Sequence, residues 1–378
     1  MMEGLQPEDL MPRQGKQAGD FFQTDSSIAR QEELERKQKI HAKSGNPVKV
    51  PSKVLALAAA PSAGGDDDEI VVYTAESGFS ARRMLLPSGT TTTVFSGLHQ
   101  GPVTCIALLH RQSSTGALEE DSIITGSWDK SAVRWDVHTG KQIASYANHH
   151  TDFIKDILVS RETGRLYTAS ADKTIRVWDL STAEVKSTLK GHSRAVEALA
   201  LDPESGDLFS GSSDTTIRRW DTQTGSCTAV INGHATSVYA LTFCDGVLWS
   251  ASADKYCMRW DLSRSVPDTK HLHPDFVKCV AVTDEYVFTG CRDEGIRVYA
   301  LATDRLVHVF SGHCGEVSTL AVVGGLLVSG SLDGTVRQWR IKDIGTLSEV
   351  EIQGAVPVEE NVSPMTAEEE AELLALMD

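Results

Sequence analysis

The chain has 378 residues, enough for two ordinary domains or for one large repeat architecture. Its formal net charge of −16 argues against direct nucleic-acid binding, because a phosphate backbone attracts a basic surface. The seven cysteines are odd in number and include no CxxC pair, which argues against a secreted disulfide framework or a zinc ribbon. No apolar run approaches the roughly 20 residues that span a bilayer, and the first residues do not resemble a signal peptide. We therefore expect a protein of the cytoplasm, the nucleus or both, with no membrane contact.

The first 47 residues form a polar N-terminal extension with one helical candidate over 26–43. Asp25-Ser26-Ser27 can cap this helix, and Gly45-Asn46-Pro47 ends the helical pattern. Its apolar residues are sparse, so a solvated helix and a partner-docking helix are both compatible with the sequence.

A repeat of about 40 residues occupies most of the remaining chain. An aromatic residue, followed by Asp in four units, stands six residues after an aspartate, and a hydroxyl residue stands four before that aspartate. A histidine opens each unit, four residues before a β-branched residue. The six sets are His99, Thr125, Asp129 and Trp135; His150, Thr168, Asp172 and Trp178; His192, Ser210, Asp214 and Trp220; His234, Ser250, Asp254 and Trp260; His273, Thr289, Asp293 and Tyr299; and His313, Ser329, Asp333 and Trp339.

Units of this length, each with three or four short strands, resemble the WD40 family, whose four-stranded sheets are the blades of a propeller. The resemblance implies that histidine, hydroxyl, aspartate and tryptophan form a hydrogen-bond chain within each blade, with Tyr299 replacing tryptophan in one of them. A degenerate first unit, in which Glu76 takes the aspartate position and Arg82 the tryptophan position, brings the count to seven. We thus predict an all-β fold, a single seven-bladed WD40 β-propeller over 48–354 with short N- and C-terminal extensions. The predicted units are 53–98, 99–149, 150–191, 192–233, 234–272, 273–312 and 313–354.

Two features near the ends stay open at this point. The last blade could be completed by TLSEVEI (346–352) or by the short N-terminal strand Val48-Lys49-Val50. Beyond it, 355–378 is an acidic tail in which Thr366 and Glu369 form a capping box for a short amphipathic helix, 366–377. Leu373, Leu374, Leu376 and Met377 give this helix its apolar end. It could fold on a separate partner, dock on its own propeller or serve as a solubilising tail.

The recurring histidine, hydroxyl and aspartate do not indicate an enzyme. A catalytic triad occurs once in a chain, whereas this set occurs six times at the same offsets. His149-His150 and His271-x-His273 could suggest metal ligands, but no thiol or carboxylate lies at zinc-like spacing. We predict no catalytic residue, no metal and no cofactor.

In propellers that resemble this one, partners bind the top face, around the mouth of the central channel. The residues before each turn aspartate and around each β-branched residue point there. The predicted partner-binding residues on this face are Trp128, Phe153, Lys155, Tyr239, Phe276, Lys278, Arg292 and Leu332. They would form an apolar-basic patch that favours an acidic peptide with an apolar anchor. Burial of Phe153 and Phe276 inside their blades is the alternative.

The resemblance favours a non-catalytic protein–protein interaction scaffold or assembly subunit, a monomer within an intracellular hetero-complex. One alternative is a substrate receptor of a ubiquitin ligase, for which the usual arginine three residues after the WD tryptophan is absent: His138, Ser181, Gln223 and Ser263 stand there. The other is an assembly factor in ribosome biogenesis or RNA processing that acts through protein contacts. Fold alone does not choose among these roles.

Overall fold

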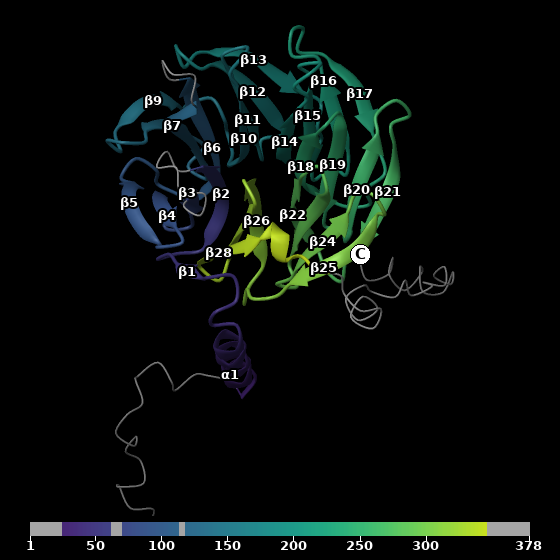
Figure 1. The fold of residues 1–378 in the computed structure, drawn as a ribbon. Coiled ribbons are helices and arrows are strands. Elements are labelled where there is room, and N and C mark those ends of the chain that lie inside the picture. The colour runs from purple at the N-terminus through teal and green to yellow at the C-terminus, as the bar shows by residue number, and fades with distance from the viewer. Residues whose placement is uncertain (1–24, 62–69, 113–117, 346–378) are drawn as a thin grey trace, which may run out of the picture. The chain divides into compact units, whose positions relative to one another are not determined.

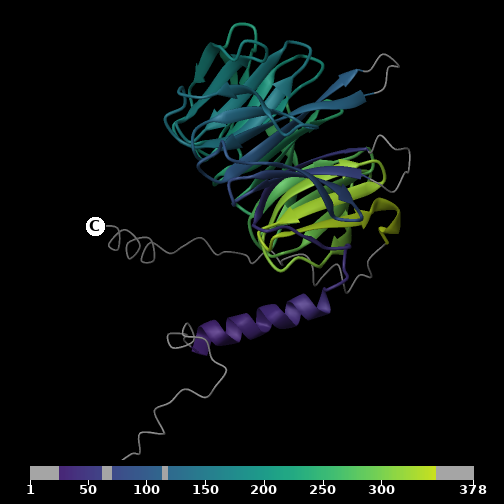
Figure 2. The same ribbon diagram turned by 90° about the vertical axis from the view of Figure 1, so that its left-hand side faces the viewer.

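The computed structural model describes residues 25–61, 70–112 and 118–345. The chain divides into two compact units, Met1–Ala42 and Lys43–Asp378. In the first unit α1 (Asp25–Ile40) is one uninterrupted helix, shown in purple in Figure 2, and it ends three residues earlier than predicted. Its side chains Leu34 and Ile40 are exposed. Among the described helices, none combines the length and apolar character that crossing a membrane requires.

The second unit contains seven antiparallel four-stranded sheets. In chain order its strands are β1 (Val48–Lys49), β2 (Val54–Pro61), β3 (Ile70–Glu76), β4 (Ala81–Leu86), β5 (Thr90–Phe95), β6 (Val103–Gln112), β7 (Leu118–Ser127), β8 (Ala132–Asp136), β9 (Gln142–Tyr146), β10 (Ile154–Ser160), β11 (Arg165–Ser170), β12 (Thr174–Asp179), β13 (Val185–Lys190), β14 (Val196–Leu201), β15 (Leu208–Ser212), β16 (Ile217–Trp220), β17 (Cys227–Ile231), β18 (Val238–Cys244), β19 (Val247–Ser252), β20 (Tyr256–Asp261), β21 (Val266–Leu272), β22 (Val277–Val282), β23 (Tyr286–Cys291), β24 (Ile296–Ala300), β25 (Arg305–Phe310), β26 (Val317–Val323), β27 (Leu326–Ser331) and β28 (Thr335–Arg340). A 3-10 helix, Ile341–Asp343, follows β28.

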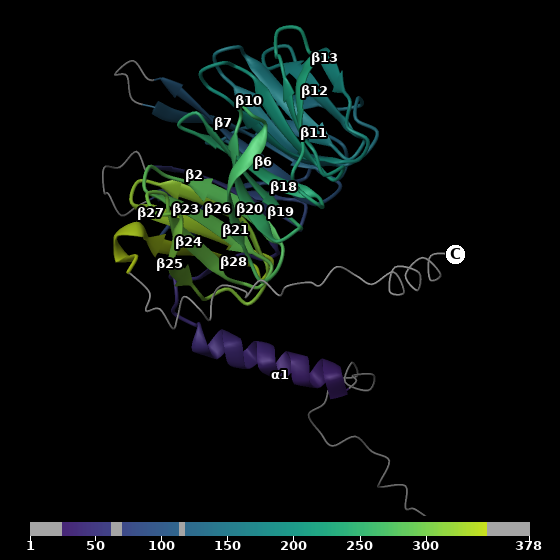
Figure 3. The same cartoon turned by 90° about the vertical axis from the view of Figure 1, so that its right-hand side faces the viewer.

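The sheets are arranged as the blades of a ring. Figure 1 shows the first strands of the blades (β2, β6, β10, β14, β18, β22 and β26) around the centre and the last strands at the rim. We number the blades 1 to 7 from β2–β5 to β26–β28. Figures 2 and 3 show the longer strands β6 and β7 extending past the rest of their blade. The seven-bladed propeller predicted from the repeat is confirmed.

Blade 7 takes its outer strand from the N-terminal side of the ring. β1 pairs antiparallel with β28, with Val48 opposite Val336 and Lys49 opposite Thr335. The N–H of Gln338 also donates to the carbonyl of Gly45 at 2.7 Å. Of the two candidates from the sequence, the N-terminal strand therefore closes the ring, while 346–352 lies outside the described residues. This pairing covers the edge of β28 and joins the two ends of the repeat in one blade, so the ring is closed.

The core is divided among the blade interfaces. A four-stranded sheet this short cannot bury both faces alone, so each blade packs on its neighbours. The buried apolar residues form seven clusters, one between each pair of adjacent blades. The tryptophans of the repeat lie in these clusters, as Trp178 does between blades 2 and 3. This packing fixes the turns at the strand ends, which form the two faces of the ring.

Candidate interaction face

In blades 2, 3, 4, 5 and 7 the four repeat residues form one continuous hydrogen-bond chain. The histidine Nδ1 lies 2.7–3.1 Å from an aspartate oxygen, and its Nε2 lies 2.6–2.8 Å from the hydroxyl of the second strand. The tryptophan Nε1 donates to the same hydroxyl at 2.8–2.9 Å. We call this arrangement the complete chain. It ties the turn between strands two and three to the connection that enters the blade.

The aspartate is the centre of each complete chain, as blade 3 illustrates. One oxygen of Asp172 accepts from His150 and from the backbone N–H of Thr151, and the other accepts from the N–H and hydroxyl of Thr174. Burial alone would raise the pKa of Asp172, but the hydrogen bonds from His150 and Thr174 outweigh it and hold the pKa below its usual value. The carboxylate therefore stays charged and fixes both segments at the top of the blade.

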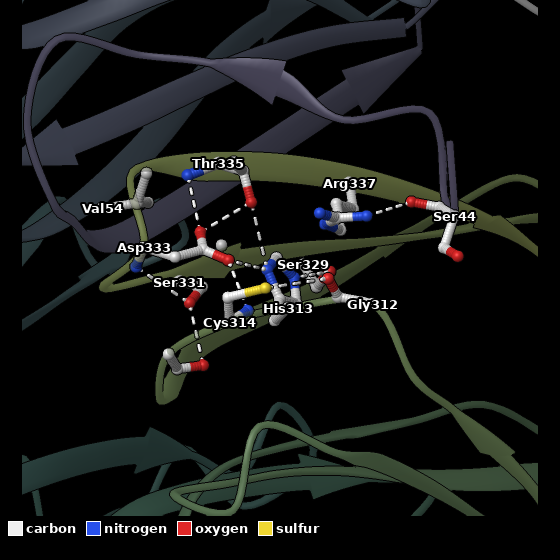
Figure 4. Close-up of polar contacts among 12 residues, drawn as sticks. Ser44, Val54, Gly312, His313, Cys314, Ser329, Ser331, Asp333, Thr335 and Arg337 are labelled. Atoms are coloured by element: carbon white, nitrogen blue, oxygen red, sulfur yellow. Dashed lines mark hydrogen bonds and ion pairs between the residues drawn. The ribbon is translucent and has the colours of Figure 1, made fainter. Parts of the chain in front are cut away.

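Figure 4 shows the same arrangement in blade 7. His313 lies between Asp333 and Ser329, and Thr335 donates to Asp333 at 2.6 Å. The guanidinium of Arg337, on the same strand, donates to the carbonyl of Ser44 in the segment that leads into β1. The hydrogen-bond chain of blade 7 therefore lies next to the pairing of β1 with β28 that closes the ring.

Blade 6 departs from the pattern. His273 contacts Thr289 at 2.8 Å, but its Nδ1 faces the carbonyl of His271 instead of Asp293. Asp293 pairs with Arg297 at 2.6 Å, and the hydroxyl of Tyr299 lies 3.4 Å from His273 Nε2. The shorter tyrosine leaves space that the ring of His271 fills by stacking on Tyr299, with 4.0 Å between centroids. The predicted His273–Asp293 link is therefore absent in this blade.

The alignment of blade 1 predicted from the sequence is wrong by two residues. Val54 pairs with Glu76 as Val103 pairs with Ser127, so Glu76 occupies a serine position, not the aspartate position. The register of β3 with β4 places Met84, not Arg82, where five other blades have tryptophan and blade 6 has Tyr299. The fixed pairing of the strands overrides the resemblance between Glu and Asp.

Glu76 nevertheless holds the turn of blade 1 by other contacts. Its buried carboxylate accepts from Ser52 at 3.0 Å and Thr74 at 3.1 Å and lies 2.8 Å from the guanidinium of Arg82. Val50 stands at the histidine position and lies in the same apolar cluster as Met84. The polar chain is thus replaced as a unit, because a buried polar residue left without its partners is costly.

The top-face residues predicted from the sequence lie at equivalent places in their blades. In each blade the N–H of the residue before the turn aspartate, or its equivalent, donates to the carbonyl of the residue before the first strand's β-branched residue. The bond joins Trp128 to Pro102 and Arg292 to Phe276, for example. These bonds hold both positions on the face where the turns between strands two and three lie.

Trp128 and Phe153 form an exposed aromatic pair at the border of blades 2 and 3. Their rings stack with centroids 5.0 Å apart and planes 17° apart. They remain 41% and 37% exposed, so Phe153 does not fill a gap inside its blade. Phe276 is half-buried, with the exposed Arg292 over its ring at 5.2 Å. Trp128 and Phe153 are thus the more accessible of the two aromatic groups.

The predicted basic character of the patch needs correction. Lys155 lies 3.4 Å from Glu197, and Lys278 lies 3.6 Å from Glu316 and 3.7 Å from the ring centroid of Tyr239. The carboxylates come from the neighbouring blades and neutralise both lysines. The channel mouth therefore presents paired charges and no excess of positive charge from Lys155 and Lys278.

These pairs line a central cavity of about 740 Å³, whose wall includes Trp128 and Leu332. Asp156, which follows Lys155 on β10, also lines the cavity. Its carboxylate accepts a hydrogen bond from the N–H of Leu199 in blade 4 at 2.8 Å. Burial raises the pKa of Asp156 to about 7. The sequence reasoning did not identify Asp156, whose position carries no repeat signal.

Sequence reasoning also missed two exposed apolar residues on the top face. Phe79 lies in the turn between β3 and β4 and is 46% exposed; Leu98 precedes His99 and is 41% exposed. With blade 1 aligned on Thr74 and Met84, Phe79 falls at the turn position that Lys130 occupies in blade 2. The corrected alignment of blade 1 would therefore have identified Phe79 as a turn residue of the top face.

The arginines that precede three of the tryptophans form ion pairs on the blade surface. Arg134 lies 2.9 Å from Asp121, Arg219 lies 2.6 Å from Asp207 and Arg259 lies 2.8 Å from Asp268. Arg259 also reaches Asp304 of blade 6 at 3.4 Å and packs over the ring of Trp249. These arginines stabilise blade surfaces away from the channel.

Two further predictions stay predictions. Within the described ranges no cluster of three or more histidine, cysteine, aspartate or glutamate side chains could hold a metal ion. Leu373, Leu374, Leu376 and Met377, predicted to bind a partner, lie outside the described residues.

Comparison with known proteins agrees with this geometry. Five segments match the family described as WD domain, G-beta repeat, at residues 89–136, 140–179, 183–221, 225–261 and 304–340, more than half of the chain. The chain belongs to the WD40 family. The matched segments end at the third strands of blades 2, 3, 4, 5 and 7, the blades with a complete chain. WD40 propellers generally mediate protein–protein interactions and are generally non-catalytic.

The relatives of this WD40 protein differ in how much of the chain their match covers. An uncharacterized WD repeat-containing protein of Schizosaccharomyces pombe is 30% identical over 373 residues, covering 95% of this chain and 98% of that protein. Mitochondrial division protein 1 of Aspergillus oryzae is 33% identical over 192 residues, 50% of this chain and 22% of that protein. Cell division control protein 4 of Saccharomyces cerevisiae is 46% identical over 67 residues, 18% of this chain and 9% of that protein. The last two matches cover a minor part of those larger proteins.

Proposed function

We propose that this WD40 protein is a non-catalytic scaffold or assembly subunit whose top face holds a protein partner. The observation that carries the proposal is the exposed stack of Trp128 on Phe153. Aromatic side chains dominate binding energy at protein interfaces, and these two are held by turns that complete hydrogen-bond chains fix. A preorganised surface loses little conformational entropy when it binds.

The residues around the stack indicate the chemistry of the partner. Lys130 and Lys173 are exposed in the turns next to it, whereas Lys155 is paired with Glu197. An acidic segment with an apolar anchor fits this surface, with its charge directed to the turn lysines and not to the channel. The seven cysteines are all free thiols, which supports a role in the cytoplasm or nucleus.

The test is quantitative affinity isolation of the tagged full chain, comparing the wild type with Trp128→Ser/Phe153→Ser. We expect recovery of direct partners to fall at least about tenfold, because central aromatic residues typically contribute more than 1.4 kcal/mol to binding. Ile143→Ser/Val266→Ser is the matched control, since both residues are exposed on outer strands of the ring. Unchanged partner recovery by a folded Trp128→Ser/Phe153→Ser protein would reject the proposal.

A further inference from the structure

The exposed large apolar side chains of the ring are unevenly distributed. In the described part of 43–345 they fall into two groups. Val94, Ile143, Val230 and Val266 are single residues on the outer strands of four blades. The other four lie in top-face connections of blades 1 to 3, and we call them the apolar arc: Phe79, Leu98, Trp128 and Phe153. Single exposed residues are ordinary on any protein, whereas a group on one face marks an interaction site.

The residue type at position 79 supports a role for the arc in binding. Phe79 has a φ of 64°, in the left-handed region that is unfavourable for a bulky side chain. The equivalent turn position has a positive φ in every blade, with Lys130, Lys173, Thr215, Lys255, Glu294 and Gly334 in blades 2 to 7, so the conformation belongs to the turn of the repeat. Phe79 is the apolar member of these seven, and because it is exposed it contributes nothing to the core.

Positive charge accompanies the arc although the chain carries a net charge of −16. The top-face connections of blades 1 to 4 carry four exposed cations, which we call the cationic flank: Lys53, Lys130, Lys173 and Arg194. Lys255 and Arg292 are exposed at equivalent turns of blades 5 and 6. The turn aspartates of blades 2 to 4 accept hydrogen bonds within their own complete chains. An occupant of this surface should therefore combine acidic and apolar residues.

We propose that the occupant is the C-terminal segment 366–377 of the same chain. This segment carries four glutamates, no lysine and no arginine, and it ends in Leu373, Leu374, Leu376 and Met377. Its apolar residues match the arc and its acids match the cationic flank. The inference rests on the proposed function of the top face and deepens it, because a docked tail covers Trp128 and Phe153 until a partner displaces it.

The connecting chain is long enough for this contact. The described part of blade 7 ends at the face opposite the arc, where the N–H of Ile341 donates to the carbonyl of Gly325 in the turn between β26 and β27. Residues 346–365 can span up to about 66 Å when extended. The six-residue strands of a blade are about 20 Å long. The tail can therefore pass around the rim and reach the top face.

Hydrogen–deuterium exchange of the full chain provides the first test. A free helix of 12 residues is marginal in water, so its amides should exchange at nearly their intrinsic rates. Docking predicts that the amides of 366–377 exchange about tenfold more slowly than that. Trp128→Ser/Phe153→Ser should abolish this protection, while the outer-strand control Ile143→Ser/Val266→Ser should leave it unchanged.

Charge reversal separates specific docking from a general loss of structure. Lys130→Glu/Lys173→Glu should weaken the protection, and adding Glu368→Lys/Glu369→Lys to the same chain should restore it. Both effects should diminish at high salt, because these charges are exposed. Protection in the wild type that none of these substitutions changes would overturn the proposal.

Photocrosslinking identifies the occupant directly. Benzoylphenylalanine at position 79 of the full chain should yield a crosslink to 363–378 within a monomer. A crosslink to the tail of a second copy, seen as a covalent dimer, would replace the proposed contact by self-association. A tail that crosslinks to nothing, together with unprotected amides, would reject it. If Trp128→Ser/Phe153→Ser still loses partners in that case, the proposed function stands and only the tail contact fails.

Discussion

Blades 3 and 6 occupy equivalent places in one ring but arrange their buried polar groups in different ways. In blade 3, Asp172 joins His150 to Thr174, and Trp178 completes the chain. In blade 6, one exchange of tryptophan for tyrosine accompanies a second buried histidine and an aspartate paired with arginine. The comparison indicates that the repeat residues act as a cooperative unit, so that changing one of them changes the partners of the others.

Blade 1 extends the same comparison. It lacks histidine, aspartate and tryptophan at the repeat positions, which Val50, Gly78 and Met84 occupy. The remaining hydroxyl, on Thr74, donates to Glu76. A blade therefore keeps the whole chain or replaces several of its members together, and in blade 6 this replacement leaves Nε2 of His271 buried without a hydrogen-bond partner.

The largest effect that tests this view is expected for Asp172→Ala. It removes the acceptor of His150, of Thr174 and of the N–H of Thr151 at a nearly buried site. We expect a loss of about 3–5 kcal/mol in the free energy of unfolding, measured by urea denaturation. Asp152→Ala is the control, since the carboxylate of Asp152 accepts only from the N–H of Phe153 among the described contacts. Equal losses in the two variants would contradict a special role for the complete chain.

A smaller effect on stability is expected when the pH is lowered, through the two buried histidines of blade 6. Burial lowers the pKa of His271 to about 4 and that of His273 to about 3. In blade 4, burial also lowers the pKa of His192, but its hydrogen bond to Asp214 opposes that shift. The two histidines of blade 6 therefore resist protonation in the folded protein more than one that faces a carboxylate.

The direction of the pH effect follows from these shifts. Unfolded histidine has a pKa of about 6.5, so between that value and pH 4 the unfolded chain binds more protons than the folded one. The contribution of these two histidines to stability is then complete above pH 6.5 and decreases as the pH falls, by about 1.4 kcal/mol per pH unit for each histidine. His271→Phe should reduce the loss between pH 7.5 and pH 5 by about 2 kcal/mol in urea denaturation. An identical pH dependence in wild type and variant would refute the assignment.

The difference between local and long-range information explains what the sequence could predict. The complete hydrogen-bond chain of blades 2, 3, 4, 5 and 7 was predictable from the sequence. Its hydroxyl and tryptophan stand ten residues apart on paired strands, as Thr168 and Trp178 do. The pairing of Lys155 with Glu197 was not, because it joins two blades through side chains that carry no repeat signal. The alignment of blade 1 failed where Glu76 imitated an aspartate and no tryptophan was present to fix the register.

The smallest effect on stability is expected for Tyr299→Phe, at the position where blade 6 has tyrosine and the complete blades have tryptophan. Tyr299→Phe in blade 6 removes only a long contact of 3.4 Å with His273 and should cost less than about 0.5 kcal/mol. Trp220→Phe in blade 4 removes a 2.8 Å hydrogen bond to Ser210 and part of the interface core, and should cost about 1–3 kcal/mol. Similar losses in urea denaturation would mean that the tyrosine hydroxyl is as important as the indole N–H. A small loss in blade 6 alone would show that this blade has already replaced the aromatic donor, with the His271 ring packed on Tyr299.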